Sequence, residues 1–136
     1  MKVFIVEDHE EIRIILKRLL RKRYPKITDI EESETGEEAL GKIPSFDPAL
    51  VLVDISLRGM DGIEMIRRLK PKCPAIRFLV VTGHEPEMYE QAAYEAGAEG
   101  VVSKYDDDMF LRSVGNLLAV SKQKGGDGAE YIVNRG

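Results

Sequence analysis

The 136-residue sequence contains one cysteine and no apolar run near the roughly 20 residues that a membrane-spanning helix needs. Cys73 cannot form an intrachain disulfide, and a lone free cysteine is typical of a reducing compartment. The N-terminal stretch MKVFIVED reaches acidic residues too early for a secretory signal peptide. We therefore expect a cytoplasmic protein that makes no contact with a membrane.

An excess of positive charge is also lacking, because the formal net charge is -4 at pH 7. Domains that bind nucleic acids usually carry a basic face, so direct nucleic-acid binding by this segment is not expected. The content of 43% hydrophobic and 32% charged residues is ordinary for one globular domain. A chain of this length buries roughly two-thirds of its unfolded surface, so its core needs neither a disulfide nor a structural metal.

Short apolar stretches alternate along the chain with segments of helical periodicity. Four stretches are rich in Val, Ile and Phe and apolar on both faces, which is typical of strands in a parallel sheet covered by helices. They are residues 2–7, 49–54, 77–82 and 100–104. A fifth and more polar stretch, residues 27–33, is better suited to a sheet edge.

Five segments between and after these stretches place apolar residues at helical spacing. The first such stripe consists of Ile12, Ile15, Leu16, Leu19 and Leu20. Ile14 is expected off this stripe, as a single exposed apolar residue beside Arg13, Lys17 and Arg18. We interpret the basic run KRLLRKRYPK as a solvated face.

The alternation predicts an α/β fold, a doubly wound five-stranded parallel sheet in the order 2-1-3-4-5 with five helices. We expect this flavodoxin-like domain to span residues 1–122. Residues 123–136 are Gly-rich and polar, and the pattern predicts a C-terminal tail or linker there.

Polar side chains follow the inner strands at the point where each strand ends. Glu7 and Asp8 follow the first strand, and Asp54 follows the third. The carboxyl ends of parallel strands form the ligand crevice where the strand order reverses, here between strands one and three. These three carboxylates should therefore converge, and they would repel one another without a cation. Mg²⁺ is the expected cofactor because it takes oxygen ligands and keeps several waters.

Thr82 ends the fourth strand and Lys104 ends the fifth, on the same edge of the sheet. A hydroxyl and an ammonium beside a metal-bound carboxylate suggest phosphoryl transfer, which depends on positioning and on neutralising charge. Asp54 is the natural nucleophile, since carboxylates form acyl-phosphate intermediates. Thr82, Lys104 and the metal could each hold a phosphoryl oxygen.

The chain resembles a receiver domain of a two-component response regulator over about residues 2–122. Four motifs carry the resemblance in the family's order and spacing: IVEDHEEIR, LVLVDISLRGMDGIEMIRRL, FLVVTG and EAGAEGVVSK. The resemblance implies that Asp54 accepts a phosphoryl group and that Asp8 and Asp54 bind Mg²⁺ directly. It also implies that Glu7 acts largely through water and that Ser56 contributes its backbone carbonyl.

The same resemblance implies that the phosphoryl group comes from a sensor histidine kinase or a phosphotransfer protein. The domain would assist its own phosphorylation and dephosphorylation without acting as an enzyme on a separate substrate. It would switch an output domain or a downstream protein, for instance through a phosphorylation-dependent dimer. Two short motifs, EDH and GAEYI, are similar to motifs of the receiver subgroup that is attached to helix-turn-helix DNA-binding domains.

Three positions depart from the family's pattern. Arg58 stands four residues after Asp54 in place of the usual proline, which predicts a looser turn. Val101 replaces an aromatic residue that in many receivers swings inward as the threonine moves. Tyr105 follows Lys104 where many members have proline. His9 and His84 flank the expected crevice, and we interpret both as solvated loop residues.

Three other functions compete with the receiver interpretation. An aspartyl-phosphate hydrolase of the haloacid dehalogenase type would need Asp-x-Asp after its first strand, whereas Asp54 is followed by Ile55 and Ser56. Flavin binding is excluded because Glu7 and Asp8 would repel its phosphate. A receiver-like adaptor that works without phosphorylation stays open because of Val101 and Arg58.

Overall fold

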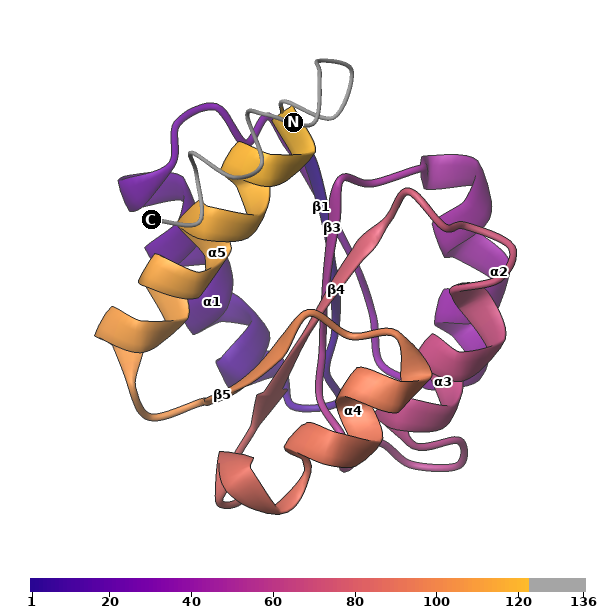
Figure 1. Ribbon diagram of the computed structural model, residues 1–136. Helices are drawn as coiled ribbons and strands as arrows, with labels where there is room; N and C mark the ends of the chain where they lie inside the picture. Colours follow the sequence, from indigo (N-terminus) through magenta and orange to yellow (C-terminus); the bar gives the residue numbers. More distant parts are fainter. Residues whose placement is uncertain (123–136) are drawn as a thin grey trace.

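The computed structural model describes residues 1–122, and its centre is a parallel five-stranded sheet (Figure 1). The strands are β1 (Lys2–Val6), β2 (Asp29–Ser33), β3 (Leu50–Val53), β4 (Arg77–Thr82) and β5 (Gly100–Ser103). Their order is β2-β1-β3-β4-β5, and every neighbouring pair is parallel. The predicted fold and strand order are confirmed. The tail predicted at residues 123–136 lies outside the described residues.

Helices cover both faces of the sheet. They are α1 (Glu10–Arg23), α2 (Gly36–Phe46), α3 (Gly62–Leu69), α4 (Glu90–Ala96) and α5 (Asp107–Lys122). Figure 1 shows α1 and α5 on one face of the sheet and α2, α3 and α4 on the other. A short 3₁₀ turn before α4, Pro86–Met88, was not predicted. None of the helices within residues 1–122 is long and apolar enough to cross a membrane.

The hydrophobic core is divided by the sheet into two layers. In β1, Phe4 packs into the layer beneath α2, α3 and α4, whereas Ile5 packs into the layer beneath α1 and α5. Every residue of β3 is buried. Both faces of the central strands are therefore covered, which explains their continuous apolar sequences.

Side-chain caps fix the loops at the carboxyl edge of the sheet. Thr35 Oγ1 accepts a hydrogen bond from the Glu38 amide at the start of α2. Asp61 Oδ1 accepts one from the Glu64 amide, 2.9 Å away, at the start of α3. These caps satisfy amides that the helix itself leaves free. The β3–α3 loop, which carries the residues after Asp54, thus has a defined end at Asp61.

The first helix differs from its predicted apolar stripe at two positions. Ile15, expected in the core, is 46% exposed, while Arg13, expected off the apolar stripe, is only 8% exposed. The Arg13 guanidinium is buried because it finds acceptors at the end of β1 and on β2. Ile14 is exposed, as predicted.

Candidate functional site

Lys104 joins two buried carboxylates at the carboxyl edge of the sheet. Its Nζ lies 2.8 Å from Glu7 Oε1 and 2.9 Å from Asp54 Oδ2. These side chains come from the ends of β5, β1 and β3, and each is less than a tenth exposed. Burial alone would lower the pKa of Lys104, but the hydrogen bonds that its ammonium donates to Glu7 and Asp54 outweigh burial and raise the pKa. The ammonium group therefore stays charged at neutral pH.

Asp8 and His9 lie beside this group. His9 Nδ1 is 3.0 Å from both Glu7 Oε2 and Asp8 Oδ1, but only the contact with Glu7 has hydrogen-bond geometry. Asp8 Oδ1 is therefore buried without a hydrogen-bond partner. The hydrogen bond with Glu7, followed by the charges of Asp8 and Glu7, raises the pKa of His9. The His9 ring is 65% exposed, so it is solvated as interpreted, but its contacts with the acid pair were missed.

The acid pair offers oxygen atoms that suit a hard cation. One donor atom each from Glu7, Asp8 and His9 lie within 4.8 Å of one another. Asp54 is outside this group and is linked to Glu7 through Lys104 instead. The unpartnered Asp8 oxygen is a good ligand for Mg²⁺, because that ion takes carboxylate oxygens and completes its shell with water. The residues present thus fit the predicted cofactor.

Thr82 and Ser56 connect the loops that surround Asp54. Thr82 is fully buried, and its Oγ1 accepts a hydrogen bond from the His84 amide, 3.1 Å away. The Ser56 amide donates to Asp54 Oδ1 over 3.2 Å, and the Ser56 hydroxyl lies 3.2 Å from His84 Nε2. His84 thereby bridges the loops after β3 and β4. The sequence predicts a position for His84 near the crevice but carries no sign of this bridge.

Arg58 brings an additional cation to the edge of the site. Its Nε is 3.8 Å from Asp8 Oδ2, and its Nη2 is 3.9 Å from Glu34 Oε1. The side chain is 71% exposed, and such pairs contribute at most about 1 kcal/mol. The turn after Asp54 is also fastened to α2, because Glu37 Oε2 accepts a hydrogen bond from the Met60 amide. The contact lies two residues after Arg58, at which the resemblance predicts proline.

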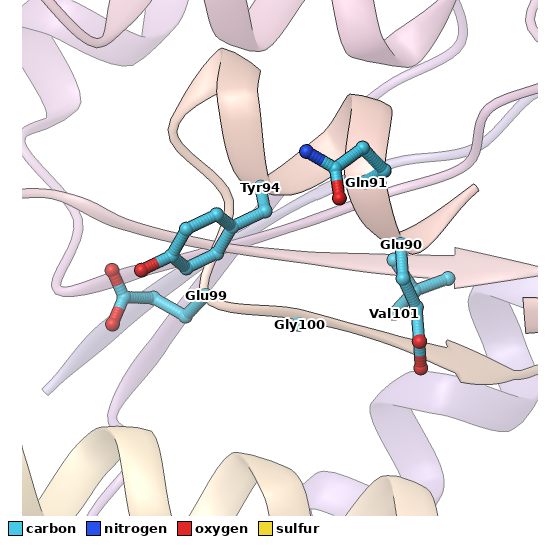
Figure 2. Close-up of a pocket in the computed structure, with 6 residues that line it drawn as sticks. All are labelled: Glu90, Gln91, Tyr94, Glu99, Gly100 and Val101. Atoms are coloured by element: carbon cyan, nitrogen blue, oxygen red, sulfur yellow. The ribbon is translucent and has the colours of Figure 1, made fainter. Parts of the chain in front are cut away.

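Val101 lies on β5 beside an open pocket of about 330 Å³ (Figure 2). The pocket is also lined by Glu90, Gln91, Tyr94, Glu99 and Gly100. Figure 2 shows the Tyr94 ring extending toward the Glu99 side chain. Tyr94 is 75% exposed, whereas Val101 is half-buried against the core. Val101 is thus a small residue with open space beside it, at the position where the resemblance predicts an aromatic side chain.

A family model described as the response regulator receiver domain matches residues 3–114. The chain belongs to this family. The predicted resemblance is confirmed, and the chain is a receiver domain of the kind found in two-component systems. The buried lysine and carboxylates therefore lie in a fold whose members typically act as phosphoacceptors and bind Mg²⁺ at an acidic pocket.

The receiver domain is similar in sequence to several transcriptional regulators. It is 29% identical over 115 residues to the transcriptional regulatory protein DegU of Brevibacillus brevis, covering 84% of this chain and 48% of that protein. It is 32% identical over 104 residues to the nitrate/nitrite response regulator NarL of Escherichia coli K12, covering 75% of this chain and 47% of that protein. The chain thus spans about half the length of these curated relatives.

Solved structures agree with this fold. A LuxR-family two-component response regulator from Aurantimonas sp. SI85-9A1 has a TM-score of 0.80 and 30% identity, covering 87% of this chain and 84% of that chain. A CheY-like receiver domain protein from Methanospirillum hungatei JF-1 also has a TM-score of 0.80, at 24% identity, covering 90% of this chain and 97% of that chain. The second likeness concerns the fold alone.

Proposed function

We propose that Asp54 accepts a phosphoryl group from a sensor histidine kinase or a phosphotransfer protein, with Mg²⁺, and that this switches an output. The observation that carries the proposal is the buried Lys104 ammonium between Asp54 and Glu7, at the point where the strand order reverses. That arrangement supplies a nucleophile and a fixed positive charge in one crevice. The family match supports the same chemistry.

In the proposed reaction, a carboxylate oxygen of Asp54 forms the new bond to phosphorus while the bond between phosphorus and the donor's leaving group breaks. Lys104 donates hydrogen bonds to one phosphoryl oxygen, and the Thr82 hydroxyl donates a hydrogen bond to a second phosphoryl oxygen. The Ser56 amide holds Asp54 Oδ1 and orients the carboxylate. Catalysis of this kind rests on positioning and on charge stabilisation.

A Mg²⁺ ion bound to Asp8 and Asp54, with Glu7 acting through water and Ser56 through its carbonyl, would neutralise charge on the phosphoryl oxygens. The chain's own residues prepare this site. Asp8 presents a buried oxygen without a hydrogen-bond partner, and the Ser56 backbone lies next to Asp54 through its amide contact. Arg58 stands at the outer edge of the pair, close to Asp8 Oδ2.

Incubation with a small phosphodonor tests the proposal against the hydrolase and adaptor alternatives. We expect wild-type protein to gain one phosphoryl group per chain with Mg²⁺ and far less with EDTA, as measured by intact mass. Rapid consumption of phosphodonor without accumulation of the phosphorylated chain would favour a hydrolase. Absence of any label with Mg²⁺ would favour an adaptor that works without phosphorylation.

Substitution of the acid pair should separate direct from water-mediated metal contacts. We expect Asp8→Asn to weaken Mg²⁺ binding more than Glu7→Gln, because a direct ligand contributes more than a contact through water. The melting temperature of metal-free Asp8→Asn should not fall, since one of several crowded negative charges is removed. Calorimetric titration and thermal melts measure both quantities. Equal Mg²⁺ affinity in the wild type and both variants would contradict these assignments.

Val101 should limit how far phosphorylation changes the surface of α4 and β5. A valine has one χ angle and cannot swing between outward and inward positions as an aromatic ring can. We expect beryllofluoride, an acyl-phosphate mimic, to shift the backbone amide signals of this face weakly in the wild type. In Val101→Tyr the shifts should be larger, because the pocket beside residue 101 can receive a ring. Large wild-type shifts that the substitution does not increase would show that the domain switches by another route.

A further inference from the structure

Arg13 is a buried arginine that the proposed phosphoryl transfer does not use. It projects from α1, and its side chain is 9% exposed. Its Nη1 donates a hydrogen bond to the backbone carbonyl of Glu7 over 2.6 Å, and its Nε donates to Glu32 Oε1 over 2.6 Å. One guanidinium therefore connects the end of β1 with a side chain of β2.

Glu32 fixes the guanidinium from the other side. It accepts a second hydrogen bond from Lys17, at 2.5 Å. Burial raises the pKa of Glu32, but the hydrogen bonds from Lys17 and Arg13 outweigh this and lower the pKa overall. Glu32 is thus a carboxylate at neutral pH, and its charge pairs with the Arg13 guanidinium and the Lys17 ammonium.

The carbonyl that Arg13 holds belongs to the peptide between Glu7 and Asp8. On the other side of Glu7, its amide donates to the Ser33 carbonyl over 3.1 Å. The backbone of the acid pair is therefore held at both peptide bonds of Glu7. Asp8, whose Oδ1 is buried without a hydrogen-bond partner, follows directly.

We infer that Arg13 is a positioning residue for the metal site, which sets the Glu7–Asp8 peptide so that Asp8 presents its carboxylate to a divalent cation. This inference rests on the proposed function. Groups that orient metal ligands from behind affect metal affinity by about 10- to 100-fold. A guanidinium suits the task because its planar fork can serve two acceptors at once, which an ammonium on a flexible chain does less well.

The direction of the change in Mg²⁺ affinity separates a positioning role of Arg13 from the effect of its positive charge. Removal of a positive charge near a cation site would by itself strengthen the binding of Mg²⁺. Loss of positioning would weaken it. The two explanations therefore predict opposite signs for a neutral substitution of Arg13.

The test is Mg²⁺ titration of the full chain, with calorimetry for affinity and with amide spectra of the metal-free protein. We expect Arg13→Met to bind Mg²⁺ about 10- to 100-fold more weakly, with shifted Asp8 and His9 amide signals before metal is added. Arg13→Lys keeps the charge and should recover only part of the affinity. Glu32→Gln keeps the Glu7 contact and should lose less affinity than Arg13→Met.

Leu16→Ala and Asp8→Asn distinguish failure of this inference from failure of the proposed metal site. Leu16→Ala destabilises the same helix from a buried position without touching the acid pair, so its Mg²⁺ affinity should stay within about twofold of wild type. The inference is overturned if Arg13→Met binds Mg²⁺ as tightly as wild type or more tightly, or if Leu16→Ala loses as much affinity. Wild-type affinity in Asp8→Asn would overturn the proposed metal site itself, and this inference with it.

Discussion

Lys104→Met should lose both stability and phosphoryl transfer. The substitution leaves Glu7 and Asp54 both buried without the ammonium that pairs with each of them. Removal of one partner from a buried ion pair typically costs about 3–5 kcal/mol of unfolding free energy. Loss of a donor to the transferred oxygens should also slow phosphorylation about 100-fold or more. Urea unfolding and the rate of labelling by a small phosphodonor measure the two effects.

A second variant separates these two losses. In Lys104→Met/Glu7→Gln one uncompensated carboxylate is removed, so part of the lost stability should return. The rate of phosphorylation should not return with it, because the missing ammonium is still absent. Stability of Lys104→Met equal to wild type would contradict the view that this lysine neutralises the buried pair.

Gly62→Ala should have the other large effect, because Gly62 lies directly against the residue that carries the nucleophile. A Cβ atom at position 62 would lie 2.1 Å from the Asp54 carbonyl oxygen and 2.9 Å from Val53 Cγ2. Backbone at that distance must move, and overpacking of this kind costs about 1–3 kcal/mol or more. We expect a marked fall in melting temperature, with displaced Asp54 amide signals and slower phosphorylation.

Gly41→Ala is a matched control with the opposite expected sign. Gly41 lies exposed within α2, and an added Cβ would meet no atom within 4 Å apart from its chain neighbours and the backbone of its own helix. Alanine in a helix interior is about 0.5–1 kcal/mol more favourable than glycine. Gly41→Ala should therefore raise the melting temperature. Equal melting temperatures for the two variants would show that the close contact at Gly62 is not what matters.

The fold could be predicted because the pattern of apolar and polar residues within each segment indicates the type of that segment and its burial. Strand β3 is apolar at every position, and its burial on both faces follows from that pattern alone. The edge position of β2 follows in the same way from its polar residues. The placement of Asp54 and Lys104 at one edge then follows from parallel strand direction.

The remaining parts of the site depend on side-chain directions across elements that are distant in sequence. Arg13 is buried because its guanidinium donates hydrogen bonds to Glu32 and to the Glu7 carbonyl. The helical periodicity of the sequence does not indicate these two contacts. The contact between Ser56 and His84 joins two loops 28 residues apart. The roles assigned to Asp54, Thr82, Lys104 and the acid pair stay predictions.

The central claim is that Asp54 receives the phosphoryl group, and mass-spectrometric mapping of that group tests it most directly. Wild-type protein and Asp54→Asn are incubated side by side with a small phosphodonor and Mg²⁺, and the modified residue is located in peptides. The account predicts one phosphoryl group on Asp54 in the wild type and none in the variant. Undiminished labelling of Asp54→Asn, mapped to another residue, would contradict it.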